Sequence, residues 1–207
     1  MAAGRPFHCG FASITRAPLS SALVVSMNQE FISILQQRTG QLAIGRSTLR
    51  NQGAPEVIGR ARSFLQGIEL SELRSVSTND QYLQFLEDRT LELSESFPLG
   101  AKGNWGAARK VLNIFFRDCL YNAYLSKEYS IERLRGWLEI PLDGDVARNL
   151  YALHKSSLPK WPNIRRLTPD ISSIYQEKAA EEAQKVGIAR VDLDIYYWRD
   201  GQYTTNQ

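Results

Sequence analysis

The sequence has few cysteines, no long apolar run, and no lysine in its first 99 residues. Cys9 and Cys119 stand in unrelated contexts and no Cys–Cys–His spacing accompanies them, which argues against a disulfide framework, a zinc site or an iron–sulfur cluster. No run of about 18 apolar residues occurs, which excludes a membrane-spanning helix. We therefore expect no metal, no cofactor and no membrane partner, and a location in the cytoplasm, at the nucleoid.

Positive charge is concentrated in the middle of the chain. Residues 1–99 hold nine Arg and nine acids, and residues 167–207 hold four bases and seven acids. Residues 100–166 hold twelve Lys and Arg against six acids, a net charge of +6 in a chain whose total is +3. Such an excess suits a surface that faces a polyanion, and a solvated face with chance clustering is the alternative.

Residues 1–26 differ from the rest, because they contain two arginines, no acid, and prolines and glycines that break any periodicity. Two interpretations compete: a start assigned too early, with translation beginning at Met27, or an acid-poor targeting peptide. We favour the first, and predict a disordered or wrongly assigned leader over 1–26 and a single helical domain over 27–207. A genuine leader would instead place the protein in an organelle or the nucleus.

The remaining pattern predicts an all-α fold. Apolar residues recur at helical spacing in four stretches, beginning with Phe31, Ile34 and Leu35 and continuing over about 57–65, 82–93 and 105–125. The broad stripe of the last stretch predicts a central helix that is nearly surrounded. Capping residues mark three helix starts: Thr78 or Asn79, Asp143 or Asp145, and Thr168 before Pro169. We expect 140–142 to be extended, and 191–198 to be a short helix capped by Asp192.

A glycine turn runs into this central helix, with the sequence Lys102-Gly103-Asn104-Trp105-Gly106-Ala107-Ala108-Arg109-Lys110. Such a turn points free backbone N–H groups outward at the positive end of a helix, which suits a nucleic-acid phosphate. The side chains of Lys102 and Arg109 would add positive charge beside it.

Chain lengths predict that Asp143 returns to the level of Lys110. A helix from Gly106 to about Leu125 rises about 30 Å, and a helix over 130–138 descends about 13 Å. An extended stretch over 139–143 adds about 15 Å in the descending direction. Because the two directions nearly cancel, we expect Lys110 and Asp143 to meet, both near helix N-terminal ends.

Two motifs then show a resemblance. Gly106-Ala107-Ala108-Arg109-Lys110-Val111-Leu112-Asn113 resembles the G-V-G-R-K-x-x-N segment of the helix-hairpin-helix DNA glycosylase superfamily. Leu142-Asp143-Gly144-Asp145-Val146-Ala147-Arg148 is similar to its V-D-x-H-V-x-R segment. The chain differs from that pattern in lacking the Pro and the first Gly of the usual L-P-G-V-G turn, and in having Ala108 for its second glycine and Asp145 for the common His. The 33 residues between Lys110 and Asp143 exceed the usual interval, and the iron–sulfur cysteines of many relatives are absent.

The resemblance implies a two-lobed helical bundle with an active site between its lobes. Lys110 would be the amine nucleophile and Asp143 the catalytic carboxylate, while DNA would be bound by Lys102, Gly103, Asn104, Gly106, Arg109 and Arg148. The chemistry needs a neutral Lys110 amine, which burial or the charge of Arg109 would favour. The partner would be double-stranded DNA with a damaged or modified base, bound by a monomer.

A flipped base has to be held between aromatic faces, and Trp105 and Trp137 are our candidates for this pocket, with Trp161 and Trp198 as alternatives. The acids Asp192 and Asp194 suggest a paired-acid site, although helix capping is the simpler interpretation. The expected function is a DNA glycosylase, with abasic-site lyase activity if Lys110 forms a Schiff base. A non-catalytic helical DNA-binding or protein-interaction domain is the alternative.

Overall fold

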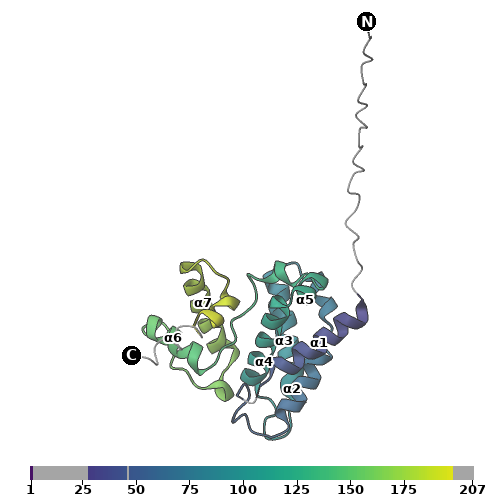
Figure 1. Ribbon diagram of the computed structural model, residues 1–207. Helices are drawn as coiled ribbons and strands as arrows, with labels where there is room; N and C mark the ends of the chain where they lie inside the picture. Colours follow the sequence, from purple (N-terminus) through teal and green to yellow (C-terminus); the bar gives the residue numbers. More distant parts are fainter. Residues whose placement is uncertain (2–27, 46, 198–207) are drawn as a thin grey trace.

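The computed structural model describes residues 1, 28–45 and 47–197, and these form helices without any strand (Figure 1). The longer helices are α1 (Gln29–Ala43), α2 (Val57–Gln66), α3 (Asn79–Ser96), α4 (Trp105–Tyr121), α6 (Gly144–His154) and α7 (Pro169–Lys185). The short ones are α5 (Ala123–Glu128) and four 3-10 turns, η1 (Leu70–Ser75), η2 (Ile131–Leu134), η3 (Ile164–Arg166) and η4 (Arg190–Asp192). The all-α prediction is confirmed, and the predicted leader and Trp198 fall outside this description, apart from Met1. No helix within the described ranges combines the length and hydropathy needed to cross a membrane.

The buried apolar side chains form two cores. The first lies among α1 to α5 and η2, and the second lies between α6, α7 and the segments next to them. Figure 1 shows these two groups of helices side by side, with the chain passing between them after η2. Val191 returns to the first core while Leu193 joins the second, so the end of the described chain contacts both.

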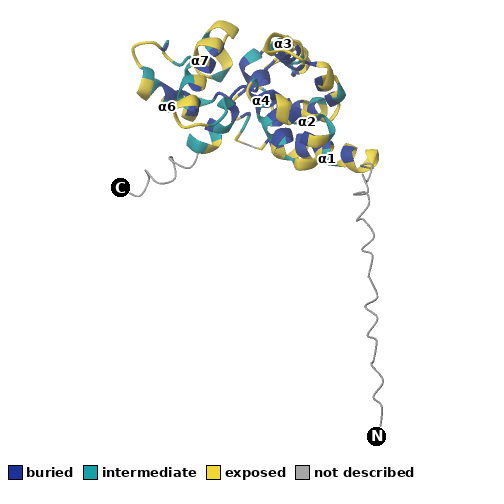
Figure 2. Cartoon of the chain, turned by 90° about the horizontal axis from the view of Figure 1, so that it is seen from above, coloured by how far each residue is buried: buried dark blue, intermediate teal, exposed yellow. Residues whose placement is uncertain are grey.

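Helix α4 is at the centre of the first core, as its sequence predicts. Twelve of its 17 residues are buried, and Figure 2 shows it surrounded by neighbouring helices. The helix ends at Tyr121, four residues earlier than expected, because Asn122 leaves the helical conformation. The Asn122 side chain then accepts hydrogen bonds from Tyr124 N and Leu125 N and starts α5. Asparagine is a favourable N-cap, so the break follows from local chemistry.

The predicted helix starts at Thr78, Asp143 and Thr168 are confirmed by their capping hydrogen bonds. Thr78 accepts from Gln81 N, and Thr168 accepts from Ile171 N. The segment predicted as a short helix over 191–198 is helical as far as residue 197, where its description ends. Its predicted cap at Asp192 is wrong, because Asp192 lies at the end of η4 and accepts from the preceding Ala189 N.

Of the apolar stripe predicted for the first helix, only Leu35 packs against the first core. Phe31 and Ile34 are 42% and 53% exposed, whereas Ile32, Gln36, Thr39, Gly40 and Ala43 are the buried residues of α1. Gln36 tolerates burial because its amide donates to the Ile68 carbonyl at 2.7 Å. Small and satisfied polar side chains therefore form the contact with α2, and two larger apolar side chains stay outside.

Gly106, in the first turn of α4, allows a second segment to lie directly on the helix. A Cβ atom at this position would lie 2.1 Å from the Ile164 carbonyl oxygen and 2.8 Å from the Leu167 Cβ. Backbone cannot move aside as a flexible side chain can. The absence of a side chain at residue 106 is therefore what lets η3 pack against the start of α4.

We expect Gly106→Ala to destabilise the protein by about 1–3 kcal/mol, the usual range for forcing an extra group into a packed site. Gly59→Ala is the matched control, because nothing lies within 4 Å of its added Cβ and it stands inside α2. The control should stabilise the protein by about 0.5–1 kcal/mol through the helix preference of alanine. Urea unfolding of both variants tests this, and equal stability of the two would contradict the packing argument.

Candidate active site

Lys110 and Asp143 meet, as the chain lengths predict. The Lys110 Nζ lies 3.3 Å from the Asp143 Oδ2, and the two side chains are 10% and 30% exposed. Lys110 comes from the second turn of α4 and Asp143 from the residue that precedes α6. The pair thus joins an element of the first core to the start of an element of the second.

Asp143 performs two tasks with its two oxygens. Its Oδ1 caps α6 by accepting hydrogen bonds from Asp145 N and Val146 N, each at 3.0 Å. Its Oδ2 is left for the Lys110 amine. Capping fixes the orientation of the carboxylate, because a rotation that freed Oδ1 would leave two amides at the helix start without a partner.

Asp194 is a further acid at this site, which the sequence interpretation as a helix cap missed. Its carboxylate forms an ion pair with Arg117 of α4, and Arg117 also pairs with Asp118. Burial is the main cause that raises the pKa of the Asp194 carboxyl, and the negative charge of Asp143 raises it further. Arg117 and Lys110 oppose this rise. The site therefore holds alternating charges from three parts of the chain.

Asp192 and Asp194 do not form one paired-acid site. Asp192 binds the Arg135 guanidinium at 2.7 Å and 2.8 Å and accepts from the Tyr121 hydroxyl at 2.8 Å. Asp194 instead binds Arg117. Nothing in a spacing of two residues indicates which of the acids would face Lys110, so only the geometry separates them.

Arg109, expected to contact DNA, is buried and bound to acids of the protein itself. Its guanidinium donates to both oxygens of Glu139 at 2.8 Å and 2.9 Å, and to Glu87 at 3.0 Å. It also lies over the Trp105 ring, 5.2 Å from the ring centroid. Arg109 is thus placed as a structural residue that holds α3 and the 139–143 segment against α4. Its charge is already compensated by these two acids.

The 139–143 segment is fixed from both sides. Asn113 of α4 donates to Glu139 at 3.0 Å, which adds to the bonds from Arg109. On the other side, the Gln176 amide of α7 binds both backbone groups of Ile140, accepting from its N–H at 3.1 Å and donating to its carbonyl at 2.8 Å. The expected extended stretch is therefore held like a short strand, with side chains replacing a neighbouring strand.

Most backbone amides of the glycine turn already have partners. Gly103 N donates to the Ser94 carbonyl at 3.0 Å, Asn104 N to the Ala101 carbonyl at 3.1 Å, and Trp105 N to the Gly103 carbonyl at 2.9 Å. The Asn104 side chain caps α4 by accepting from Ala107 N. The turn has the left-handed conformation at Gly103 that favours glycine, with φ of +74°. In this conformation these amides are not free to bind a phosphate.

The other predicted DNA-binding side chains are exposed. Lys102 pairs with Glu95 at 3.3 Å, and Arg148 pairs with Asp145 at 2.9 Å, with more than half of each side chain accessible. Such exposed pairs contribute little stability, so both cations can be recruited by another anion. Gly106, in contrast, is covered by η3.

The two predicted tryptophans occupy different environments. A groove of about 640 Å³ between α3, α4 and α7 is lined by Trp105, whose Nε1 donates to Glu87 at 2.9 Å. Trp137 does not line this groove and packs against the first core. Arg109 and Glu139 form part of the wall, whereas Lys110 and Asp143 do not. The groove therefore does not include the Lys110–Asp143 pair, although its wall contains Arg109, the neighbour of Lys110 in the sequence.

No group of three His, Cys, Asp or Glu side chains within residues 28–45 and 47–197 is arranged to hold a metal ion. Cys119 is buried in α4, and burial raises the pKa of its thiol well above the usual value. A thiol in this state is a poor nucleophile and a poor metal ligand. The amine of Lys110 is thus the better candidate for covalent chemistry.

No protein-family model, curated protein or solved structure matches this chain. The candidate site therefore rests on its own geometry and on the two sequence motifs that meet in it.

We expect Glu139→Gln to destabilise the protein by about 3–5 kcal/mol, because it leaves Arg109 buried without its main counter-charge. Glu132→Gln is the control, since Glu132 makes an exposed pair with Arg135. That change should cost no more than about 1 kcal/mol. Chemical denaturation at neutral pH measures both, and a small loss for Glu139→Gln would show that the buried pair is not essential to the fold.

Glu139 should also make stability depend on pH. Burial would raise the pKa of its carboxyl, but the hydrogen bonds and charge of Arg109 outweigh burial and hold this pKa below the usual 4.5. A pKa lowered by folding gives a contribution that is complete above the unfolded value and is lost as pH falls through the folded value. We expect the free energy of unfolding to fall below about pH 4.5 in the wild type and less steeply in Glu139→Gln. Parallel pH profiles would contradict this assignment.

Proposed function

We propose that the protein is a DNA glycosylase that excises a damaged or modified base and has abasic-site lyase activity. The contact between Lys110 Nζ and Asp143 Oδ2 at 3.3 Å carries this proposal. Further support comes from the two motifs that resemble the helix-hairpin-helix glycosylases, because they supply the two members of this contact although Lys110 and Asp143 are 33 residues apart (143 − 110), a longer interval than is usual in that family.

The proposed chemistry begins at the sugar carbon C1′. As the bond from C1′ to the base breaks, the base leaves with the electron pair and positive charge develops on the sugar. A carboxylate held next to this carbon stabilises that charge, and capping of α6 keeps Asp143 oriented for the task. The Lys110 amine then bonds to C1′, and Asp143 Oδ2 is positioned to accept a proton from its nitrogen.

The lyase step follows from the same covalent bond. The sugar ring opens as its C1′–O4′ bond breaks and O4′ takes up a proton, which gives a protonated imine between Lys110 and C1′. The imine acidifies the C2′ proton, and its removal expels the 3′ phosphate and cleaves the strand. Water then releases the amine. No step consumes an oxidant or a reductant, and the two side chains, the substrate and water account for all the bonds.

The fold proposal follows from the same resemblance. We propose that the two cores correspond to the two lobes of a glycosylase-type bundle, with the Lys110–Asp143 pair at their junction. The substrate would be double-stranded DNA, bound by a monomer in the cytoplasm or nucleoid. Base flipping would bring the target nucleotide out of the duplex to the amine.

Borohydride trapping tests the nucleophile. A duplex with a single abasic site, incubated with the full chain and borohydride, should give a covalent adduct, because borohydride reduces the imine to a stable amine. We expect Lys110→Ala and Lys110→Gln to abolish the adduct. The control Lys127→Ala, which removes an exposed lysine of α5, should retain it. Thermal melting confirms that each variant is folded. Adduct formation by folded Lys110 variants would overturn the assignment.

The two tasks of Asp143 can be separated by substitution. Asparagine is also a good N-cap, so Asp143→Asn should keep α6 stable while removing the charge, and Asp143→Ala should cost about 0.5–2 kcal/mol of stability. We expect both variants to lose at least about 100-fold in the rate of base excision, a typical loss for a group that stabilises transition-state charge. Asp145→Asn, two residues away and exposed, is the control. Full activity of Asp143→Asn on a panel of damaged duplexes would show that the Asp143 carboxylate is not catalytic.

A further inference from the structure

The positive charge of residues 100–166 is not spread evenly over this region. Residues 100–145 hold seven Lys and Arg and six acids, a net charge of +1. Residues 146–166 hold five Lys and Arg and no acid, which accounts for the remaining +5. The absence of acids continues to residue 169. We call residues 146–169 the acid-free arc.

Many arginines outside the arc serve internal contacts. Arg62 and Arg190 donate to backbone carbonyls, at 2.6 Å to Ile44 and at 2.7 Å to Trp137. Others are paired with acids or bound to carbonyls, namely Arg74, Arg109, Arg117, Arg133 and Arg135. These charges are therefore not available to a partner.

Four of the five bases of the arc have no acidic partner among the described residues, and the fifth, Arg148, makes an exposed pair with Asp145. Lys155, Lys160 and Arg166 are exposed, and none of them forms an ion pair with any residue in the described part of the chain. Arg165 is also exposed and donates to the Gly100 carbonyl at 3.2 Å. Like charges without counter-charges repel one another, and a polyanion relieves that repulsion on binding.

The arc has a fixed conformation although residues 155–163, between α6 and η3, are a loop. Leu158 and Leu167 are buried in the second core. The Tyr175 hydroxyl of α7 donates to the Pro159 carbonyl at 2.8 Å, and the Trp161 ring packs edge-on against the Tyr175 ring at 5.2 Å. Cations held on such a frame lose little conformational entropy when they bind a partner.

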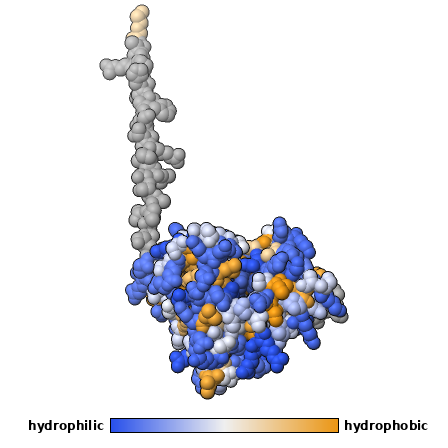
Figure 3. All heavy atoms as spheres, turned by 180° about the vertical axis from the view of Figure 1, so that it is seen from behind, coloured by the Kyte–Doolittle hydropathy of each residue, from blue (hydrophilic) through white to orange (hydrophobic). Residues whose placement is uncertain are grey.

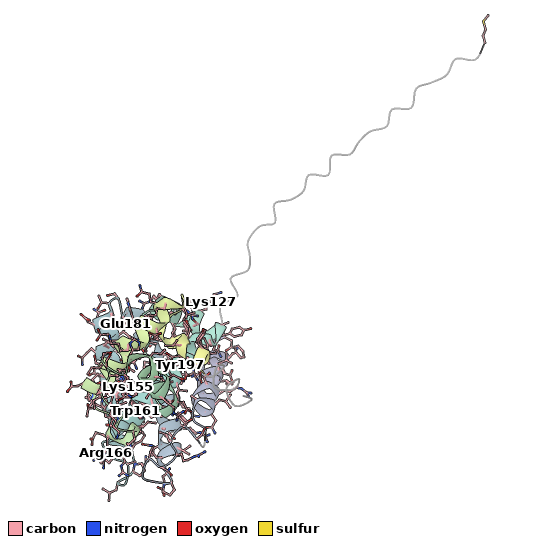
Figure 4. All side chains as sticks on the ribbon, turned by 90° about the vertical axis from the view of Figure 1, so that its left-hand side faces the viewer. Lys127, Lys155, Trp161, Arg166, Glu181 and Tyr197 are labelled. Atoms are coloured by element: carbon pink, nitrogen blue, oxygen red, sulfur yellow. The ribbon has the colours of Figure 1, made fainter. Side chains whose placement is uncertain are left out.

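The arc begins and ends beside the candidate active site. Its first residue, Val146, follows the Asp143 cap, and η3 at its other end lies on Gly106 in α4. Lys110 follows Gly106 by four residues, a rise of about 6 Å along the helix. Figure 4 shows Lys155, Trp161 and Arg166 following one another down the side of the second group of helices, with Glu181 of α7 above them.

The face of the molecule opposite to the view of Figure 1 has no large continuous apolar patch among the residues that the structure describes. Figure 3 shows it to be mostly hydrophilic, with hydrophobic residues in small separate patches. Scattered apolar side chains are normal on a protein surface and do not by themselves indicate a protein partner.

We propose that the acid-free arc binds the phosphate backbone of duplex DNA and holds the strand against the Lys110–Asp143 site. The proposal deepens the proposed function and rests on it for the choice of DNA as the polyanion. It also replaces the glycine-turn amides, which are occupied, as the main source of phosphate contacts. The side chains of Lys155, Lys160, Arg165 and Arg166 would supply the contacts.

Salt dependence of DNA affinity tests the arc. Fluorescence anisotropy with an undamaged duplex gives the affinity at several NaCl concentrations, and each lost phosphate contact should reduce the slope of log K against log[NaCl] by about 0.9. We expect the triple variant Lys155→Gln/Lys160→Gln/Arg166→Gln to lose about two to three in this slope. Arg165 is left unchanged because it also holds the Gly100 loop.

The control is Arg38→Gln/Arg60→Gln/Lys127→Gln, which removes the same charge from exposed residues of the first group of helices. It should keep the slope of the wild type. Circular dichroism and thermal melting establish that both triple variants are folded. An arc variant with the wild-type slope, or a control variant with an equal loss, overturns the proposal.

The outcome separates the arc from the enzyme. If the wild type forms no borohydride adduct but the arc variant selectively loses salt-dependent DNA affinity, the catalytic proposal fails and the arc is supported. If the wild type forms an adduct and the arc variant binds DNA normally, the enzyme stands and the arc proposal is overturned. Stronger binding of the wild type to anionic phospholipid vesicles than to DNA, lost in the arc variant, would also overturn it.

Discussion

The buried pair between Arg109 and Glu139 is the contact on which the arrangement of the site depends. It fastens the start of the 139–143 segment to α4, while Gln176 fastens the same segment to α7. Asp143 follows Glu139 by four residues, so it reaches Lys110 only because this segment is held extended along the helix. A charged pair that does no chemistry thus determines where the reactive groups lie.

Burying such a pair carries a large desolvation cost. Both charges lose water, and only close geometry with further hydrogen bonds compensates. Here the compensation comes from two parallel bonds between the guanidinium and the carboxylate, with Glu87, Thr90 and Asn113 as additional partners. A hydrophobic contact would not impose the same direction on the 139–143 segment. The main effect of the pair is therefore to fix the position of this segment along α4, and its net contribution to stability is secondary.

The meeting of Lys110 and Asp143 could be predicted from the sequence because it depends on fixed quantities. Helix rise and the length of an extended residue do not vary much, and an error in one helix end is largely offset along the return path. The expected helix did end too late, at Leu125 instead of Tyr121, and the helix expected over 130–138 is only the 3-10 turn Ile131–Leu134. Neither error changed the outcome. Caps such as Thr78 and Asp143 were equally predictable, since they depend on neighbours three residues away.

The remaining features depend on contacts between distant residues. An arginine inside a basic motif gives no sign that Glu139, thirty residues later, will neutralise it. Two amides of the glycine turn are bound by carbonyls that precede it in the chain, those of Ser94 in α3 and of Ala101 in the following loop. These amides are therefore not free for a phosphate. The partners of Asp194 come from α4, far from it in sequence. The net charge of a segment does not by itself indicate a binding surface, because many arginines are bound to acids or carbonyls inside the protein.

The bare backbone at Gly106 links two stretches of chain that are about sixty residues apart. Because η3 packs directly on that backbone, the first turn of α4 determines how the acid-free arc is oriented relative to the Lys110 amine. The residue at this position is consequently a diagnostic marker. A homologous chain with any larger residue there would have to carry its η3 equivalent elsewhere, and its bases would approach a bound strand from a different angle even if the lysine and the aspartate were retained.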